Sequence, residues 1–193
     1  MTKSDGVVLR SVLFAPGNRA DVLRKLPRSR PDAAIIDLED AVPFGEKEAA
    51  RAVARLVAAE LAQSHHGFNL FVRINAADTP WFDDDVARAL VPTLAGVVLP
   101  KYERPGQLEK LATALRAHGL GHLSVIAGIE TAAGVERVGD LLHGPVIAAY
   151  FGAEDFIVDM GGERTPENLE VLYARSRVAV AARVAGVAAL DQV

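Results

Sequence analysis

The chain has 193 residues, of which 50% are apolar and 24% are charged, and its formal net charge is −4. This composition can bury the core of one domain and excludes an intrinsically disordered chain. The net negative charge gives no indication of a nucleic-acid partner, and no apolar run reaches membrane-spanning length. The chain has no cysteine, which excludes disulfides and thiolate metal sites. We therefore expect a soluble cytoplasmic protein that binds neither nucleic acid nor membrane.

Short apolar runs alternate with helical stretches along the whole chain. The predicted strands cover residues 8–16, 32–40, 68–75, 94–101, 122–130, 144–152 and 187–191. The predicted helices cover residues 19–26, 45–63, 79–90, 105–119, 131–142 and 165–186. Thr79 and Thr165, each followed by proline, are expected to begin two of these helices, and Gly119 is expected to end another. Strands that alternate with helices indicate parallel βαβ units.

Two parallel folds fit this order, an open doubly wound sheet and a (β/α)8 barrel. The segment APGNRAD after the first strand has a single glycine and lacks the G-x-G-x-x-G pattern of dinucleotide-binding open sheets. The barrel is favoured, although eight strands need about 250 residues. We therefore predict one α/β domain over residues 1–193. It is a TIM (β/α)8 barrel of about seven β units, incomplete at its C-terminal end, so either the chain is a fragment or closure comes from elsewhere.

Charged side chains occur at the carboxyl ends of five consecutive predicted strands. These positions are Asp37, Glu39 and Asp40, then Arg73, then Lys101, then Glu130, and finally the turn from Gly152 to Asp155. In a barrel, these strand ends meet at the face that carries catalysis. Period-two alternation places Asp37 and Glu39 on one face of their strand, and Arg73 on the same face as Phe71.

Such a rim supports a specific chemistry. Glu130 and Asp155, from neighbouring strands, can hold one Mg²⁺, which prefers oxygen ligands and keeps positions open for water or substrate. A 2-oxoacid can fill two of these positions. Arg73 would stabilise the negative charge of a developing enolate. Asp37 or Glu39 would orient the Arg73 side chain without contacting the substrate itself.

Each of these positions also has a purely structural interpretation. Glu130 can be an acidic residue matched to a helix dipole. The GAED segment, residues 152–155, can be a simple turn, and Arg73 can pair with Asp37 for stability alone. Lys101 follows a proline and is interpreted as a solvated strand end. Periodicity alone therefore indicates an α/β enzyme with an acidic rim and goes no further.

Longer strings carry more information than the periodicity. The segments SVLFAPGNR, AAIIDLEDAVPFGEKEAAR, FVRIN, VVLPK, IETAAGV and YFGAEDF occur in this order. Together they resemble the citrate lyase β-subunit (CitE-like) branch of the HpcH/HpaI aldolase superfamily, from about residue 10 to the C-terminus. The most specific part is DLEDAV followed by GAED, whereas VRIN or LPK alone is a weak signal.

The resemblance implies a (β/α)8 barrel, usually trimeric, that cleaves or forms a C–C bond in acyl-CoA or acyl-carrier thioesters. It implies that Glu130 and Asp155 bind Mg²⁺ and that Arg73 contacts the oxoacid. It also implies that the backbone of the GAED turn lies beside the substrate carboxylate. The substrate-binding positions implied in this way are Arg73, Glu130, Gly152, Ala153 and Glu154.

The reaction implied is the cleavage of citryl-CoA, or of a citryl-carrier thioester, to oxaloacetate and an acetyl thioester. The alternatives are a malyl-CoA or citramalyl-CoA lyase, a related thioesterase or synthase, and a non-catalytic subunit of a lyase complex. The expected partners are the thioester, further copies in a homotrimer, and citrate lyase alpha- or gamma-type subunits. Members of the family continue through an eighth strand and a helical tail, so we expect a truncation after Val193. We assign no general acid or base.

Overall fold

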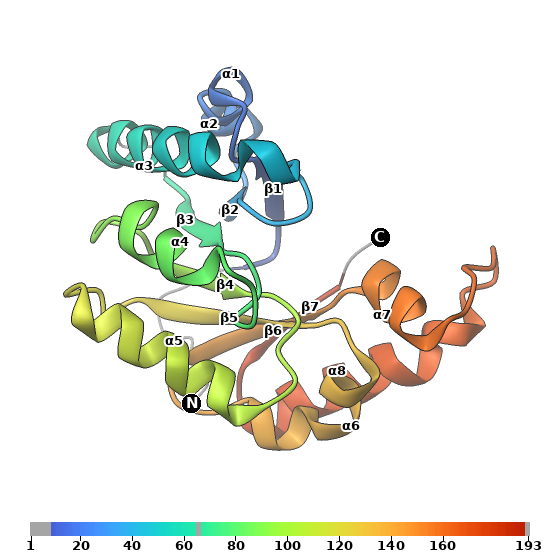
Figure 1. Ribbon diagram of the computed structural model, residues 1–193. Coiled ribbons are helices and arrows are strands. Elements are labelled where there is room, and N and C mark those ends of the chain that lie inside the picture. Colours follow the sequence, from blue (N-terminus) through green and yellow to red (C-terminus); the bar gives the residue numbers. More distant parts are fainter. Residues whose placement is uncertain (1–8, 65–66, 192–193) are drawn as a thin grey trace.

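The computed structural model describes residues 9–64 and 67–191. Its strands form one parallel sheet in the order β1 to β7, and the sheet curls into half of a barrel with helices along its outer face (Figure 1). The strands are β1 (Val12–Pro16), β2 (Ala33–Asp37), β3 (Asn69–Arg73), β4 (Gly96–Leu99), β5 (Ser124–Ile129), β6 (Val146–Phe151) and β7 (Ala188–Leu190). Every strand pairs with its neighbours in sequence, so the carboxyl ends of all seven lie at one rim.

The helices connect successive strands. They are α1 (Ala20–Leu23), α2 (Leu26–Ser29), α3 (Lys47–Gln63), α4 (Phe82–Arg88), α5 (Pro105–Ala117), α6 (Ala132–Leu141), α7 (Ala153–Met160) and α8 (Leu172–Ala185), with 3₁₀ turns η1 (Phe44–Glu46) and η2 (Leu169–Val171). Across residues 9–64 and 67–191, no helix is long and apolar enough to cross a membrane.

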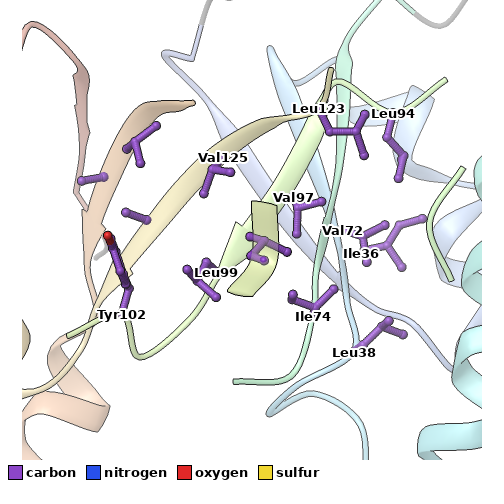
Figure 2. Close-up of a cluster of buried hydrophobic side chains, with 14 of the residues drawn as sticks. Ile36, Leu38, Val72, Ile74, Leu94, Val97, Leu99, Tyr102, Leu123 and Val125 are labelled. Carbon is purple, nitrogen blue, oxygen red and sulfur yellow. The ribbon is translucent and has the colours of Figure 1, made fainter. Parts of the chain in front are cut away.

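Both faces of the sheet are buried, which explains why the strands read as continuous apolar runs. The outer face packs against the helices, and Figure 2 shows part of this core. Its strand residues include Ile36, Val72, Val97, Leu99 and Val125. The inner face forms a second, smaller core that includes Ile35, Phe71, Val98, Ile126 and Tyr150. Ile35 and Phe71 lie side by side in the β2–β3 register and share this inner face.

Two helices begin later than the sequence predicts. The Thr79 hydroxyl donates to the carbonyl of Ala76 at 2.7 Å, and α4 begins three residues later, at Phe82. The Thr165 hydroxyl donates to the Glu170 carboxylate at 2.7 Å, and α8 begins at Leu172. In both cases the hydroxyl bonds within a turn instead of capping a helix, which threonine does readily.

Two further helix predictions have opposite outcomes. The predicted end of α5 is confirmed, because the helix stops at Ala117 and Gly119 has a left-handed φ of 72°. The predicted turn at Gly152 to Asp155 is wrong in form, because residues from Ala153 onward belong to α7.

The fold class is confirmed as α/β with seven parallel strands. A closed (β/α)8 barrel is not shown, because β1 and β7 each pair with a single strand within the described residues. The half-barrel nevertheless gathers all the predicted rim positions at one end.

Candidate functional site

A cavity of about 240 Å³ opens at the carboxyl ends of the strands. Its lining residues are Phe14, Asp37, Asp40, Arg73, Glu130, Tyr150, Gly152, Glu154 and Asp155. They come from β1, β2, β3, β5, β6 and the first turn of α7, or from the loops that directly follow these elements. The cavity therefore collects most of the charged side chains that the sequence places at strand ends.

Arg73 is fixed by its partner on the neighbouring strand. Asp37 and Arg73 lie side by side in the β2–β3 register. Arg73 donates from Nε to Asp37 Oδ1 at 2.8 Å and from Nη2 to Asp37 Oδ2 at 2.6 Å. Asp37 also accepts the backbone N–H groups of Glu39 and Ala41 at 2.8 and 3.1 Å. The guanidinium lies 5.3 Å from the ring centre of Phe14, within cation–π range. The bidentate pair leaves Nη1 directed toward the remaining carboxylates.

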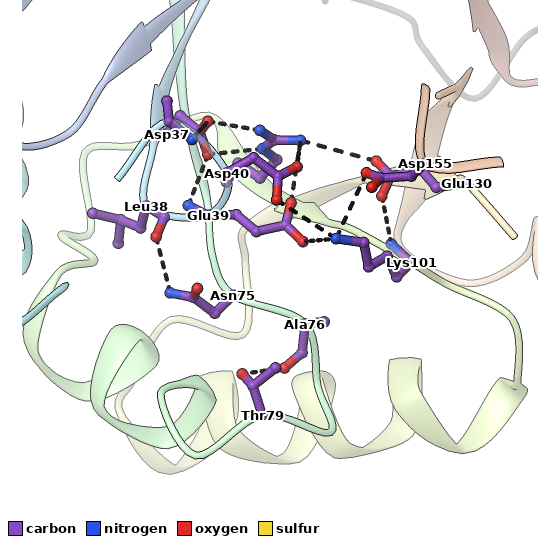
Figure 3. A network of polar contacts seen from close by, with 12 residues as sticks. Asp37, Leu38, Glu39, Asp40, Asn75, Ala76, Thr79, Lys101, Glu130 and Asp155 are labelled. Atoms are coloured by element: carbon purple, nitrogen blue, oxygen red, sulfur yellow. Dashed lines mark hydrogen bonds and ion pairs between the residues drawn. The ribbon is translucent and has the colours of Figure 1, made fainter. Parts of the chain in front are cut away.

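Glu39 lies between the two cations of the site. Its Oε2 is 3.1 Å from Arg73 Nη1, an ion pair without hydrogen-bond geometry. Its Oε1 accepts a hydrogen bond from Lys101 Nζ at 2.9 Å (Figure 3). Burial raises the pKa of Glu39 to about 7, although the charge of Arg73 acts in the opposite direction. Arg73 and Lys101 therefore share one buried carboxylate.

Lys101 is a component of the site, and its interpretation as a solvated strand end is wrong. Its φ of 49° is in the left-handed region, which is uncommon for a residue with a side chain. Its Nζ lies 3.6 Å from both Asp40 Oδ1 and Asp155 Oδ2 (Figure 3). Burial lowers the pKa of Lys101, but the charges of Glu39 and its neighbours outweigh burial and raise it. The ammonium group therefore stays charged among three carboxylates.

Glu130 follows β5 and is almost completely buried, with 1% of its surface exposed. Its Oε1 accepts a hydrogen bond from the Tyr150 hydroxyl, and its Oε2 accepts the backbone N–H of Lys101 at 3.2 Å. Burial raises the pKa of Glu130, whereas the Tyr150 hydrogen bond and the charge of Arg73, 4.0 Å away, lower it. Asp155, on the first turn of α7, keeps 35% of its side chain exposed. One carboxylate is thus rigidly held and the other is accessible.

The three residues before Asp155 differ in their surroundings. Gly152 lines the cavity, and a Cβ at this position would lie 2.7 Å from Glu130 Cγ, so the close approach requires glycine. Ala153 is half-buried and packs against the outer core rather than lining the cavity. Glu154 lines the cavity, but its side chain accepts a hydrogen bond from Arg164 at 2.7 Å.

The donor set fits a hard divalent cation. Among the residues that the structure describes, five carboxylates are in ion-pair contact with two cations, Arg73 and Lys101, which leaves an excess of negative charge when all are ionised. Burial penalises the charge of Glu130, so a bound cation would stabilise its ionised form. In the described parts of the chain, no group of three or more His, Cys, Asp or Glu side chains is arranged so that it could hold a metal ion by itself. Few protein ligands, all of them oxygens, match the coordination habits of Mg²⁺.

Sequence reasoning missed Phe14 and Tyr150, and it placed Lys101 at the rim without assigning it a role in the site. Tyr150 lies two residues before Gly152 in a strand, so the alternation could have placed it on the inner face. Phe14 has the same kind of signal in β1, where it lies beside Ile35 in the register. For Lys101, the sequence gives no signal for the contacts with Glu39, Asp40 and Asp155, which the side chain makes from a left-handed backbone.

Comparison with known proteins shows the same family over nearly the whole chain. Residues 10–193 match the family described as HpcH/HpaI aldolase/citrate lyase. The chain is 54% identical over 187 residues to a citrate lyase subunit beta-like protein of Deinococcus radiodurans, and covers 65% of that protein. It is 33% identical to the citrate lyase subunit beta of Leuconostoc mesenteroides, of which it covers 63%. In both cases 95% of the chain is matched, and it spans slightly under two thirds of these relatives' length.

Solved structures agree with this assignment. The citrate lyase beta subunit of Mycobacterium tuberculosis complexed with oxaloacetate and magnesium has a TM-score of 0.75 at 29% identity, over 93% of this chain and 76% of that one. Protein CitE of the same organism, in complex with magnesium, acetoacetate and coenzyme A, has a TM-score of 0.76 at 28% identity, over 95% and 66%. The chain therefore belongs to the HpcH/HpaI aldolase/citrate lyase family.

Proposed function

We propose that this chain carries the active site of a Mg²⁺-dependent carbon–carbon lyase that releases a 2-oxoacid from an acyl thioester. The observation that carries the proposal is the cavity that brings Arg73, Glu130 and Asp155 together at the carboxyl ends of parallel strands. Relatives named as citrate lyase beta subunits support a citryl thioester as the substrate and oxaloacetate as the product. The thioester would be carried by coenzyme A, which one structural neighbour binds, or by a carrier protein.

Glu130 and Asp155 would hold the metal ion. The ion supplies electrophilic stabilisation of oxygen atoms that gain negative charge. Tyr150 and the Lys101 backbone fix the carboxylate of Glu130, so its orientation is set before any ligand arrives. Asp155 is the more exposed of the two and stays accessible to an entering cation.

Arg73 would bind the oxoacid end of the substrate. Removal of the proton from the substrate hydroxyl allows the C–C bond to break, which forms the carbonyl of the oxoacid. The bonding electron pair passes to the thioester fragment as an enolate, and a proton then completes the acetyl thioester. Asp37 and Phe14 hold Arg73 in place, so its positive charge is preorganised toward the cavity. The backbone of Gly152, Ala153 and Glu154 would lie beside the substrate carboxylate.

A citramalyl thioester is the second candidate substrate. The mitochondrial citramalyl-CoA lyase of Homo sapiens is 29% identical to this chain over 203 aligned positions. Citramalyl-CoA would release pyruvate and malyl-CoA would release glyoxylate, so the oxoacid identifies the substrate.

The whole protein would close a (β/α)8 barrel and assemble as a homotrimer, with or without citrate lyase alpha- and gamma-type subunits. The greater length of the curated relatives and their names as subunits support this part of the proposal. Light scattering on the whole protein measures its oligomeric state directly, and a monomer would contradict the trimer.

A cleavage assay tests the proposed reaction. The whole protein is offered citryl-, malyl- and citramalyl-CoA, with Mg²⁺ and with EDTA, and the released oxoacid is identified. We expect oxaloacetate from citryl-CoA, loss of activity in EDTA and recovery with added Mg²⁺. EDTA-resistant cleavage would contradict the metal-dependent mechanism, and pyruvate from citramalyl-CoA alone would move the assignment to the second candidate.

A further inference from the structure

Tyr150 is a fully buried tyrosine whose hydroxyl meets a charged group. It lies on β6 with only 2% of its surface exposed. Its hydroxyl donates to Glu130 Oε1, while the backbone N–H of Lys101 donates to Glu130 Oε2 at 3.2 Å. Both oxygens of the buried carboxylate are therefore held from opposite sides, by β6 and by the end of β4.

The neighbouring strand is built to allow this contact. Gly128 lies directly opposite Tyr150 in the β5–β6 register and shares a strand face with Glu130. A Cβ at Gly128 would lie 2.6 Å from the Tyr150 hydroxyl oxygen and 2.8 Å from Glu130 Oε1. Only a residue without a side chain leaves room for the tyrosine to cross β5 and reach the carboxylate.

The ring of Tyr150 has a separate packing role. It contacts Phe14 edge to face, with ring centres 6.2 Å apart, and it belongs to the inner core. Phenylalanine at position 150 would keep this packing and remove only the hydroxyl. The hydrogen bond can therefore be tested without emptying the core.

We infer that Tyr150 is a positioning residue for the metal-binding carboxylate, and that with the Lys101 backbone it fixes the direction in which Glu130 presents its oxygens to Mg²⁺. The inference rests on the proposed function, since it assigns a role relative to the proposed metal ligand. Groups that hydrogen-bond a ligating carboxylate orient it, and their loss lowers metal affinity about 10- to 100-fold.

A second buried tyrosine provides a matched control. Tyr102 is also completely buried, but within the described residues its hydroxyl has no hydrogen-bond partner. Mg²⁺ binding is measured by calorimetry for the wild type, Tyr150→Phe, Tyr102→Phe and Glu130→Met. We expect the Kd for Mg²⁺ to rise about tenfold or more in Tyr150→Phe. In Tyr102→Phe the Kd should stay within about twofold of the wild-type value. Glu130→Met should not bind Mg²⁺.

The outcomes separate the inference from the proposed function. Loss of binding in Glu130→Met with an unchanged Kd in Tyr150→Phe would overturn the inference alone. A wild type that does not bind Mg²⁺, or a Glu130→Met variant that binds normally, would overturn the metal site and the inference with it.

A metal-free measurement checks the contact itself. In EDTA, Tyr150→Phe is expected to lower the thermal midpoint in the wild-type background and to have a smaller effect beside Glu130→Met, because the acceptor is then absent. Equal shifts in both backgrounds would overturn the inference by showing that the hydroxyl does not act through Glu130.

Discussion

Removal of Asp37 is expected to destabilise the protein severely, because it leaves a buried guanidinium without its main partner. Asp37 is 1% exposed and accepts four hydrogen bonds, two from Arg73 and two from backbone N–H groups. Breaking one partner of a buried ion pair typically costs about 3–5 kcal/mol. We therefore expect Asp37→Ala to lower the free energy of unfolding by about this amount, measured by urea denaturation followed by circular dichroism.

A control and a double variant make this prediction specific. Asp21 also pairs with an arginine, Arg19, but both side chains are more than half exposed. Asp21→Ala should leave the urea midpoint almost unchanged. The loss in the double variant Asp37→Ala/Arg73→Met should be smaller than the sum of the losses in the two single variants, because both changes remove the same ion pair. A loss below about 1 kcal/mol in Asp37→Ala, or fully additive losses in the double variant, would refute the reasoning.

Three further predictions concern the scaffold. Arg10 lowers the pKa of Asp32 to about 2, so the stability that this ion pair contributes is present above the ordinary carboxyl pKa and disappears as the pH falls through about 2. Asp32→Asn should therefore unfold at a lower urea concentration than the wild type at pH 7 but match it below pH 2. Equal urea midpoints at pH 7 would contradict this. In Gly96→Ala, the added methyl group would overlap the carbonyl oxygen of Ser124 and should lower the free energy of unfolding by about 1–3 kcal/mol. An unchanged free energy of unfolding in urea denaturation would disprove this. Phe82 is fully buried, so Phe82→Ala should lower the same quantity by about 3–5 kcal/mol, whereas Phe44→Ala, at a 77% exposed position, is the control and should have little effect.

The sequence predicts the positions of strand residues well, because alternation and buried runs depend on local pattern alone. It places Asp37, Arg73 and Glu130 at one rim, and the β2–β3 register then brings Asp37 beside Arg73. The sequence alone does not decide whether Arg73 pairs with Asp37 for stability or for function, and the observed contacts of Arg73 are compatible with both roles. Arg73 is held by Asp37 while its Nη1 faces Glu39 and Glu130.

Features that depend on an unusual backbone conformation or on the register between strands cannot be predicted from the local sequence pattern. The strand pattern places Lys101 at the rim, but no residue pattern predicts the left-handed backbone from which its side chain contacts Glu39, Asp40 and Asp155. Tyr150 meets Glu130 only because Gly128 lies opposite it in the register of β5 and β6. Thr79 followed by proline is a reasonable helix start, yet its hydroxyl bonds to Ala76 within a turn. In each case a tertiary or turn contact outweighs the local preference.

A magnesium titration tests the central claim most directly, because it asks whether the two rim carboxylates form one cation site. Calorimetry on the whole, metal-free protein compares the wild type with Glu130→Gln and Asp155→Asn. The control is Glu60→Gln, which removes a carboxylate on α3 that pairs with Arg24 at 2.8 Å. We expect one Mg²⁺ per chain in the wild type and the control, and no measurable binding in either rim variant, with all four proteins folded. Binding of wild-type affinity in Glu130→Gln or Asp155→Asn would contradict the assignment of these residues as the metal ligands.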